Sequence, residues 1–186
     1  MLEELVIKNR SYRRFYHNEK IKKRTLFELI DLARKCPSAA NLQPIRYKIS
    51  NTEARNSEIF ACCKWAGYLK DWDGPNRREK PTGYIIFITN KDYKNVEYDI
   101  GIAAQTILLA AVEKELGGCI IGSIDRDKLR KVINLDNKYR INLILALGKP
   151  KEKVQLETMK ENNHKYWRDK LSIHHVPKRK LADIII

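Results

Sequence analysis

Residues 100–116, with the sequence IGIAAQTILLAAVEKEL, form the most hydrophobic long segment of the chain. Apolar side chains surround this segment almost completely, which predicts a central helix buried on nearly all sides rather than a surface helix. Gly117 and Gly118 follow directly and are typical of a helix end. The fold therefore depends on how the rest of the chain covers this helix.

Buried strands are predicted on both sides of that helix. The apolar runs at 84–88 and 141–147 are bounded by turn residues, as expected of strands covered on both faces. A short strand is predicted at 119–121. Residues 45–49 alternate apolar and basic side chains, which indicates a strand with one exposed face. Because helices and strands do not alternate regularly, an α+β fold is expected, with helices packed around a central sheet.

Further helices are predicted from their start signals. Thr25 and Glu28 have the spacing of a capping box, so a helix is expected to start at Thr25. Thr52 is expected to cap a second helix, and Asp125 a third. Residues 64–80 are polar and contain several Gly, Pro and Trp residues, which predicts a long loop.

The composition is that of a folded protein. The chain has 186 residues, of which 43% are hydrophobic and 32% are charged, so one domain over residues 1–186 is expected, with a basic extension from about residue 150. No apolar run is long enough to span a membrane, and the acidic start differs from a secretion signal, so a cytoplasmic protein is expected. The four cysteines lack a CxxC spacing, which predicts free thiols and no metal site.

The net charge of +14 predicts an anionic partner. Nucleic acid is one candidate, a phosphorylated cofactor or substrate is another, and a general contribution to solubility is a third. Basic residues are scattered among acidic ones, and no nucleic-acid-binding motif or aromatic stacking platform is found. A basic nucleic-acid-binding module is therefore kept as the alternative function from another class.

Motifs of several common enzyme classes are absent. The chain contains no G-x-S-x-G, H-E-x-x-H, G-x-G-x-x-G or Walker A pattern, which argues against hydrolases, zinc proteases and conventional nucleotide sites. His174 and His175 are adjacent, so their side chains diverge in an extended chain, and both are expected to be solvated. The chain ends in three isoleucines, Ile184–Ile186, which predict a strand that pairs with a sheet, with a frayed tail as the alternative.

Three polar clusters remain as candidate ligand sites. Residues 10–13, RSYR, combine guanidinium groups with a hydroxyl, which suits a phosphate dianion. In residues 37–44, PSAANLQP, small side chains allow close approach of the backbone to a ligand, and polar ones can bind the edge of a heteroaromatic ring. Pro44 favours an extended conformation for Gln43. Residues 177–180, PKRK, form the third cluster. Solvated basic segments and an ordinary helix–strand loop are the plain alternatives.

Together these segments resemble the FMN-dependent nitroreductase family. The resemblance starts at Arg10–Phe15 and is most specific in the PSAANLQP segment. It continues through Asp99–Gln105, Gly117–Ile124 and Leu145–Pro150, in the same order and over most of the chain. It implies a nitroreductase-like fold with a central mixed β-sheet flanked by helices. It also implies a homodimer in which residues 151–186 wrap onto the partner and exchange the last strand.

The resemblance assigns the basic clusters to the cofactor phosphate. Arg10, Ser11 and Arg13 would hold the phosphate and ribityl chain of FMN. Arg179, together with Lys178, would close on the same phosphate from the C-terminal side.

The resemblance assigns the remaining cofactor contacts to the flavin ring. The loop at 37–44 would line the ring from the partner subunit, through Pro37, Ser38, Asn41 and Gln43. Backbone amides at Ile121 and Gly122 would contact the pyrimidine side.

The activity implied is hydride transfer from NADH or NADPH to bound FMN, followed by transfer to a small organic acceptor such as a nitroaromatic compound or a quinone. No catalytic side chain is expected, because the flavin carries the chemistry. The chain departs from the family pattern at Asn9, where a basic residue is frequent, and at Ile45, where Trp is frequent. Residues 65–80 match no familiar member and are interpreted as a substrate lid. A flavin-binding sensor or store without turnover is a further alternative.

Overall fold

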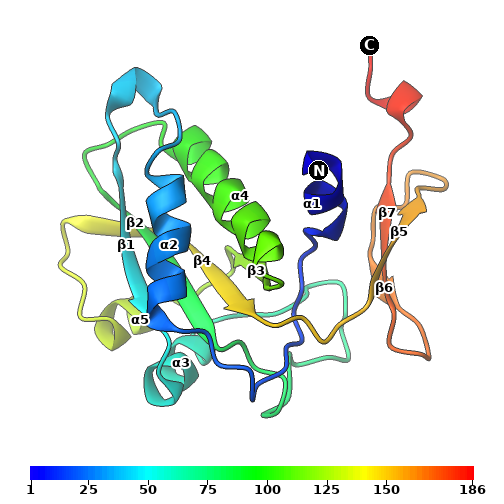
Figure 1. Ribbon diagram of the computed structural model, residues 1–186, viewed down its shortest axis with the longest axis horizontal. Coiled ribbons are helices and arrows are strands. Elements are labelled where there is room, and N and C mark those ends of the chain that lie inside the picture. Colours follow the sequence, from blue (N-terminus) through cyan, green and yellow to red (C-terminus); the bar gives the residue numbers. More distant parts are fainter.

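The computed structural model describes residues 1–186 and contains five α-helices and two β-sheets (Figure 1). The helices are α1 (Leu2–Lys8), α2 (Lys23–Ala33), α3 (Glu53–Phe60), α4 (Glu97–Glu113) and α5 (Arg126–Val132). The strands are β1 (Ile45–Ser50), β2 (Gly83–Asn90), β3 (Gly117–Ile121), β4 (Tyr139–Gly148), β5 (Val154–Thr158), β6 (Trp167–Arg168) and β7 (His174–Lys178). None of these helices combines the length and apolar character that crossing a membrane requires.

The larger sheet has the strand order β1-β2-β4-β3, and all its neighbours are antiparallel. Its central strands β2 and β4 are buried on both faces, as their continuous apolar runs predict. Ile85 and Phe87 face the core under α2 and α4, whereas Ile86 belongs to the core on the side of α3 and α5. Parallel pairing occurs in the smaller sheet and in a single bridge between Ser11 and Gly118.

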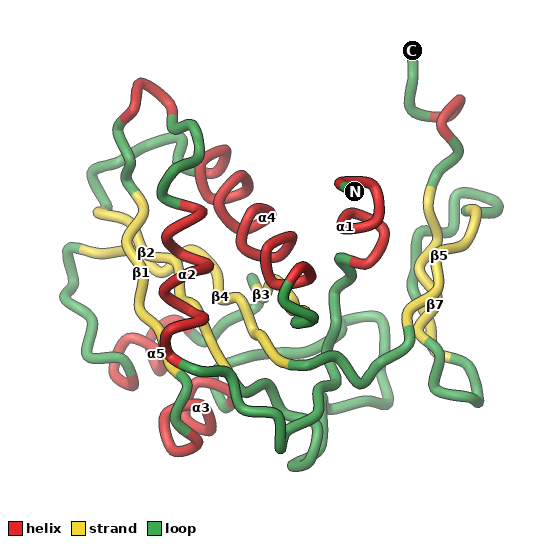
Figure 2. The backbone as a smooth tube through the Cα atoms, in the orientation of Figure 1, coloured by secondary structure: helices red, strands yellow, loops and turns green.

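Two helix layers cover the larger sheet and complete the α+β architecture (Figure 2). Helices α2 and α4 lie side by side over one face, and α3 and α5 lie at the other face. Each strand of the central pair therefore contributes alternate side chains to two separate cores, which explains why both strands consist almost entirely of apolar residues.

Helix α4 is less enclosed than its composition predicts. The sheet and α2 cover the face that carries Ile100, Ala104 and Ile107. On the opposite face, Tyr98 is 76% exposed and Ile102 is 42% exposed. The prediction of burial on nearly all sides is therefore wrong for the single chain, because α4 has more apolar surface than the sheet and α2 cover.

The helix starts confirm some of the expected capping signals and correct others. Helix α2 begins after Lys22, so Thr25 lies inside the helix and the predicted capping box is wrong. Helix α5 is capped as predicted, because the Asp125 carboxylate accepts a hydrogen bond from the backbone N–H of Lys128 at 3.0 Å. Thr52 occupies the N-cap position of α3 without a capping hydrogen bond from its side chain.

Two glycines allow the segment after α1 to lie directly against the sheet. A Cβ atom on Gly117 would lie 2.5 Å from the Tyr12 ring, and one on Gly148 would lie 2.7 Å from the ring of Phe15. Phe15 itself is completely buried. Only glycine permits this approach at either position, and residues 10–15 are thereby fixed beside the edge strand β3.

After Pro150 the chain leaves the larger sheet and forms a separate C-terminal arm, residues 151–180 (Figure 1). In this arm β5 pairs with β7 in parallel, and β6 pairs with β7 in antiparallel orientation. None of these three strands is predicted from the sequence. The strand expected at Ile184–Ile186 is absent from the single chain, where these residues follow a short 3-10 turn and are exposed.

Candidate functional site

A cavity of about 280 Å³ lies between the segment after α1, β3, α4 and the C-terminal arm. It is named the cationic cavity here, and its basic lining residues are Arg10, Arg13 and Lys178. Its other lining residues are Asn9, Ser11, Gln105, Leu108, Gly118, Ile120, Tyr166, His174 and Val176. The structure thus brings together four of the residues that the family resemblance assigns to the cofactor phosphate, at positions 10, 11, 13 and 178.

The positive charge of this cavity is not neutralised by the protein. No carboxylate lies within 4.0 Å of the side-chain nitrogens of Arg10, Arg13 or Lys178, whereas the neighbouring Arg14 and Arg168 are both paired with glutamates. The buried Nε of Arg10 has no hydrogen-bond partner, and burial lowers the pKa of this guanidinium. Uncompensated cations with free donors are the arrangement that binds a phosphate group.

Arg13 is fixed from several sides by the C-terminal arm. Its backbone N–H donates to Oε2 of Glu152 at 2.9 Å. Its guanidinium lies 4.8 Å from the ring centre of Tyr166, and its Nη1 lies 3.3 Å from Nε2 of His174. The same Nη1 donates to the carbonyl oxygen of Ser11 at 3.2 Å. The arm therefore determines where this side chain points, although Arg13 and the arm are more than a hundred residues apart.

A second cavity, of about 170 Å³, lies on the other side of Arg13. Ile121 and Gly122 line it at the end of β3, opposite Lys64 and Trp65 from the loop that follows α3. Arg13 and Ile120 line both cavities. The backbone expected to contact the pyrimidine side of a flavin therefore lies next to the expected phosphate site, as an elongated ligand requires.

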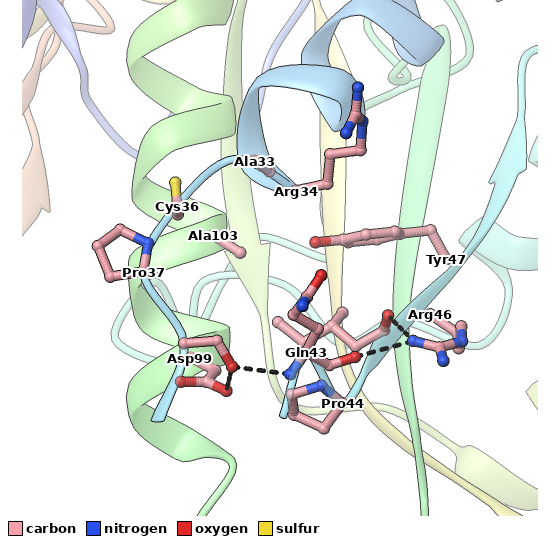
Figure 3. A pocket seen from close by; sticks show the side chains of 12 residues that line it. Ala33, Arg34, Cys36, Pro37, Gln43, Pro44, Arg46, Tyr47, Asp99 and Ala103 are labelled. Carbon is pink, nitrogen blue, oxygen red and sulfur yellow. Dashed lines mark hydrogen bonds between the residues drawn. The ribbon is translucent and has the colours of Figure 1, made fainter. Parts of the chain in front are cut away.

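The loop at 37–44 lies away from these two cavities in the same chain. Pro37, Ser38 and Gln43 line a third cavity of about 140 Å³ together with Asp99 (Figure 3). It shares no lining residue with the cationic cavity. Asn41 lies outside this lining and accepts hydrogen bonds from Nε2 of Gln43.

Arg179 is also separate from the cationic cavity. Its Nη1 donates to Oδ1 of Asn162 at 2.9 Å, and it does not line the cavity that Lys178 lines.

Asp99, at the start of α4, holds the 37–44 loop in a strained conformation. Its carboxylate accepts hydrogen bonds from the Ser38 hydroxyl at 2.8 Å and from the Ala39 amide at 3.1 Å. Left-handed φ angles of 48°, 53° and 47° occur at positions 40, 41 and 43. The extended conformation predicted for Gln43 is therefore wrong, because its amide donates to the Ser38 hydroxyl instead. Left-handed backbone costs about 1–2 kcal/mol per residue and is frequent at ligand sites.

The C-terminal arm contributes side chains to the candidate site that no sequence pattern predicts. His174 is 1% exposed and lines the cationic cavity, and His175 is 7% exposed. His175 lies between the carboxylates of Glu157 and Asp169 and stacks on Trp167 at 4.0 Å. The expectation of two solvated histidines is wrong, because the arm folds into a sheet whose partners are remote in sequence. The adjacent pair HH is itself the only local signal.

The loop at 64–80 contains no helix or strand, as predicted, and it docks on the same arm. The Tyr68 hydroxyl lies 3.0 Å from Nε2 of His164, and the Tyr68 ring lies 5.0 Å from the Tyr166 ring. The guanidinium of Arg168 lies over the ring of Trp72 at 4.6 Å. The arm thus contacts both Arg13 and the loop.

Comparison with known proteins places this arrangement in a family. A curated relative, the iodotyrosine deiodinase of Thermotoga neapolitana, is 28% identical over 167 residues, which cover 81% of this chain and 89% of the relative. The structure of an iodotyrosine deiodinase bound to FMN and 3-iodo-L-tyrosine superimposes with a TM-score of 0.67 at 22% identity, covering 88% of this chain and 99% of the other.

A second solved structure has a similar fold over the full length of the chain. It is an FMN- and NADPH-dependent nitroreductase from Sphigopyxis sp. strain HMH, with a TM-score of 0.70 at 17% identity, covering 100% of this chain and 98% of the other. The model of the nitroreductase family matches residues 7–149. The chain therefore belongs to the nitroreductase family.

Proposed function

We propose that this protein is an FMN-dependent oxidoreductase that uses NADH or NADPH to reduce a small organic acceptor, and that it works as a homodimer. The observation that carries the proposal is the convergence of Arg10, Arg13 and Lys178, none of them paired with a carboxylate, on one cavity. Arg13 also lines the neighbouring cavity, which is lined by Ile121 and Gly122. A phosphate joined to a flat ring fits this combination of a cationic end and a backbone-lined end.

The residues of this chain then have distinct roles. Arg10, Ser11, Arg13 and Lys178 bind the phosphate, and Arg13, which lines both cavities, also places a positive charge between the phosphate end and the ring end of the site. When bound, FMN supplies the hydride and electron transfer itself. A fixed positive charge beside the ring stabilises the negative charge that reduction creates, so the protein contributes position and electrostatics rather than an acid or base.

A homodimer would complete the site, because the 37–44 loop lines a different cavity from the cationic cavity of its own chain. Asp99, at the start of α4, holds this loop through two hydrogen bonds. The neighbouring α4 face exposes Tyr98 and Ile102, and the chain ends in exposed isoleucines. We infer that two α4 faces pack together, and that residues 151–186, while contacting Arg13 of their own chain, also wrap onto the partner and exchange the last strand. Ser38, Asn41 and Gln43 would then line the partner's flavin.

The acceptor is proposed to bind beside Ile121 and Gly122. Lys64 and Trp65 line that cavity. Trp65 is the first residue of the 65–80 loop, which we propose acts as a lid over the ring. Nitroaromatic compounds and quinones are the acceptor classes proposed first. Halogenated aromatics are added because a relative that covers most of the chain is an iodotyrosine deiodinase.

The proposal is tested by steady-state kinetics of the FMN-loaded protein. NADH and NADPH oxidation are followed with a nitroaromatic compound and a quinone, and 3-iodo-L-tyrosine is tested under anaerobic conditions. We expect oxidation of at least one nicotinamide, with parallel double-reciprocal lines for a reaction in which the nicotinamide leaves before the acceptor binds. Bound flavin that neither nicotinamide reduces would support a sensor or store instead.

A further inference from the structure

His174 occupies a place that the proposed function leaves unexplained. It lies on β7, is 1% exposed and lines the cationic cavity. Its Nε2 lies 3.3 Å from Nη1 of Arg13, and its ring centre lies 5.1 Å from that of Tyr166. Tyr166 in turn carries the Arg13 guanidinium on its face. Arg13 is thus held between a histidine and a tyrosine of the C-terminal arm.

The contact between Arg13 and His174 has one consistent chemical interpretation. A guanidinium can only donate hydrogen bonds, so Nε2 of His174 must accept and the ring proton must reside on Nδ1. That Nδ1 is buried and has no partner. Burial, together with the positive charges of Arg13 and Arg168, lowers the pKa of His174 to about 4, although Glu152 acts in the opposite direction. The imidazole is therefore neutral at neutral pH.

A neutral acceptor such as His174 can orient an arginine without cancelling its positive charge, which a carboxylate cannot do. The arginines next to this site, Arg14 and Arg168, are oriented by Glu79 and Glu152, which also cancel their charge. The Arg13 side chain has no such partner and is directed by the Ser11 carbonyl and by His174. Its full positive charge therefore remains available to an anionic ligand.

We propose that His174 is a positioning residue of the cofactor site, which orients the Arg13 guanidinium toward the anion in the cationic cavity without neutralising it. The inference rests on the proposed function, because FMN is the anion considered. Beyond that function, the residue at position 174 must both accept a hydrogen bond from Arg13 and remain uncharged.

The tautomer of His174 tests the geometry without any substitution. Long-range ¹H–¹⁵N correlation spectra of the ¹⁵N-labelled protein at neutral pH distinguish the two neutral tautomers of each histidine. The proposal predicts a protonated Nδ1 and an unprotonated Nε2 for His174, the reverse of the form that dominates in free histidine. A protonated Nε2 would overturn it, since that nitrogen could not accept from Arg13.

The functional test compares FMN dissociation constants, measured by quenching of flavin fluorescence, for wild type, His174→Gln, His174→Glu and His174→Ala. Gln and Glu have nearly the same shape and both offer an oxygen acceptor to Arg13, but the Gln amide is neutral and the Glu carboxylate is charged. Gln should bind FMN within about 3-fold of wild type, whereas Ala should lose about 10-fold and Glu at least as much, as expected for one hydrogen bond to a charged group. His17→Gln, a histidine outside the three cavities, is the matched control.

A double-mutant cycle shows whether His174 acts through Arg13. In the presence of Arg13→Ala, the further change His174→Ala should weaken FMN binding less than 3-fold, because the group that His174 orients is gone. Equal losses with and without Arg13, or equal affinities of the Gln and Glu variants, would overturn the inference. Wild-type protein that binds no FMN at all would instead overturn the proposed function on which the inference rests.

Discussion

At the scale of single residues, the site is defined by which charges have partners. Glu152 is buried and accepts hydrogen bonds from Arg168 and from the backbone N–H of Arg13, so this carboxylate is already engaged. Arg10, Arg13 and Lys178 are left without a carboxylate. Grouping like charges without a counter-ion destabilises the folded chain, and a bound anion relieves this cost.

The first prediction concerns Arg13. Arg13→Ala should weaken FMN binding by about 1.5–3 kcal/mol, the contribution of one hydrogen bond to a charged group. The measurement is a fluorescence titration of the apoprotein. Arg24→Ala is the matched control, because Arg24 is an arginine on the exposed surface of α2, where it pairs with Glu28. An unchanged affinity in the Arg13 variant would remove this residue from the site.

A second prediction follows from the pKa of His174, which is about 4 in the folded protein against an ordinary value of 6.5. Between these pH values the unfolded chain binds more protons than the folded chain, so the free energy of unfolding falls as pH is lowered through this range. The contribution of this one group is on the order of 2 kcal/mol between pH 7 and pH 4.5.

Urea unfolding of wild type and His174→Gln at pH 7 and pH 4.5 measures the contribution of His174. All other titrating groups are the same in the two proteins, so their effects cancel in the comparison. The glutamine variant should lose less stability on acidification than wild type. Nearby charged groups that also face His174 are Glu152, Arg13, Arg168 and His175. Equal pH dependence in the two proteins would show that His174 is not held neutral by its surroundings.

At the scale of secondary-structure elements, the C-terminal arm organises the site. It supplies Glu152, Tyr166, His174 and Lys178 to the surroundings of Arg13, and it contacts the 64–80 loop through His164 and Arg168. Burial lowers the pKa of His175, but the carboxylates of Glu157 and Asp169 outweigh burial and raise it. The two adjacent histidines are therefore shifted in opposite directions, because burial at the cavity lowers the pKa of His174 and the carboxylates within the arm raise the pKa of His175.

The contact between the segment after α1 and β4 gives a third prediction. Gly148→Ala would place a Cβ atom 2.7 Å from the ring of Phe15, which is fully buried. Overpacking of this kind costs about 1–3 kcal/mol, and it should also displace Arg10 and Arg13. Chemical denaturation and FMN titration measure the two effects. Gly67→Ala has no heavy atom within 4 Å of the added Cβ and should be neutral for stability.

The elements also show how far the sequence determines the fold. Strands β2 and β4 are predictable because their apolar runs require burial on both faces, and α4 is predictable because its long apolar segment requires cover on at least one face. The strands of the arm are not predictable, because β5 and β7 mix charged and apolar residues and are stabilised by pairing rather than by a core. The Thr25–Glu28 spacing predicts the wrong start for α2, because these residues lie inside a longer helix that begins at Lys23.

The candidate site is predictable to a similar degree. Arg10, Ser11, Arg13 and Lys178 meet in one cavity as the family resemblance implies, although the resemblance, rather than the charge pattern, identified them. The role of His174 depends on a partner that is 161 residues away in sequence. No local pattern encodes such a contact, and the neutrality of this histidine follows only from its burial beside two arginines.

At the scale of the whole molecule, the exposed face of α4 is the proposed contact between two chains. Tyr98 and Ile102 lie on the face that the sheet and α2 leave open. Asp99, which follows Tyr98 in the first turn of α4, holds the 37–44 loop. Packing of two such faces would bring this loop toward the flavin of the other chain. Dimerisation and cofactor binding are therefore expected to be coupled.

The fourth prediction tests this coupling with two substitutions at one position. Ile102→Arg places a charge in the proposed interface, so the protein should have the mass of a single 21.8 kDa chain and a much weaker affinity for FMN. Ile102→Leu keeps the apolar surface and should remain a dimer. Analytical ultracentrifugation with a parallel FMN titration measures both properties. An Ile102→Arg monomer with undiminished FMN affinity would contradict the proposal that the partner completes the site.

The most direct test of the central claim is the stoichiometry of FMN binding to the purified apoprotein, measured by quenching of flavin fluorescence. We predict saturable binding of one FMN per chain, with the cofactor remaining bound through gel filtration. Failure to bind FMN supplied in excess would contradict the assignment of Arg10, Ser11, Arg13 and Lys178 to a flavin phosphate.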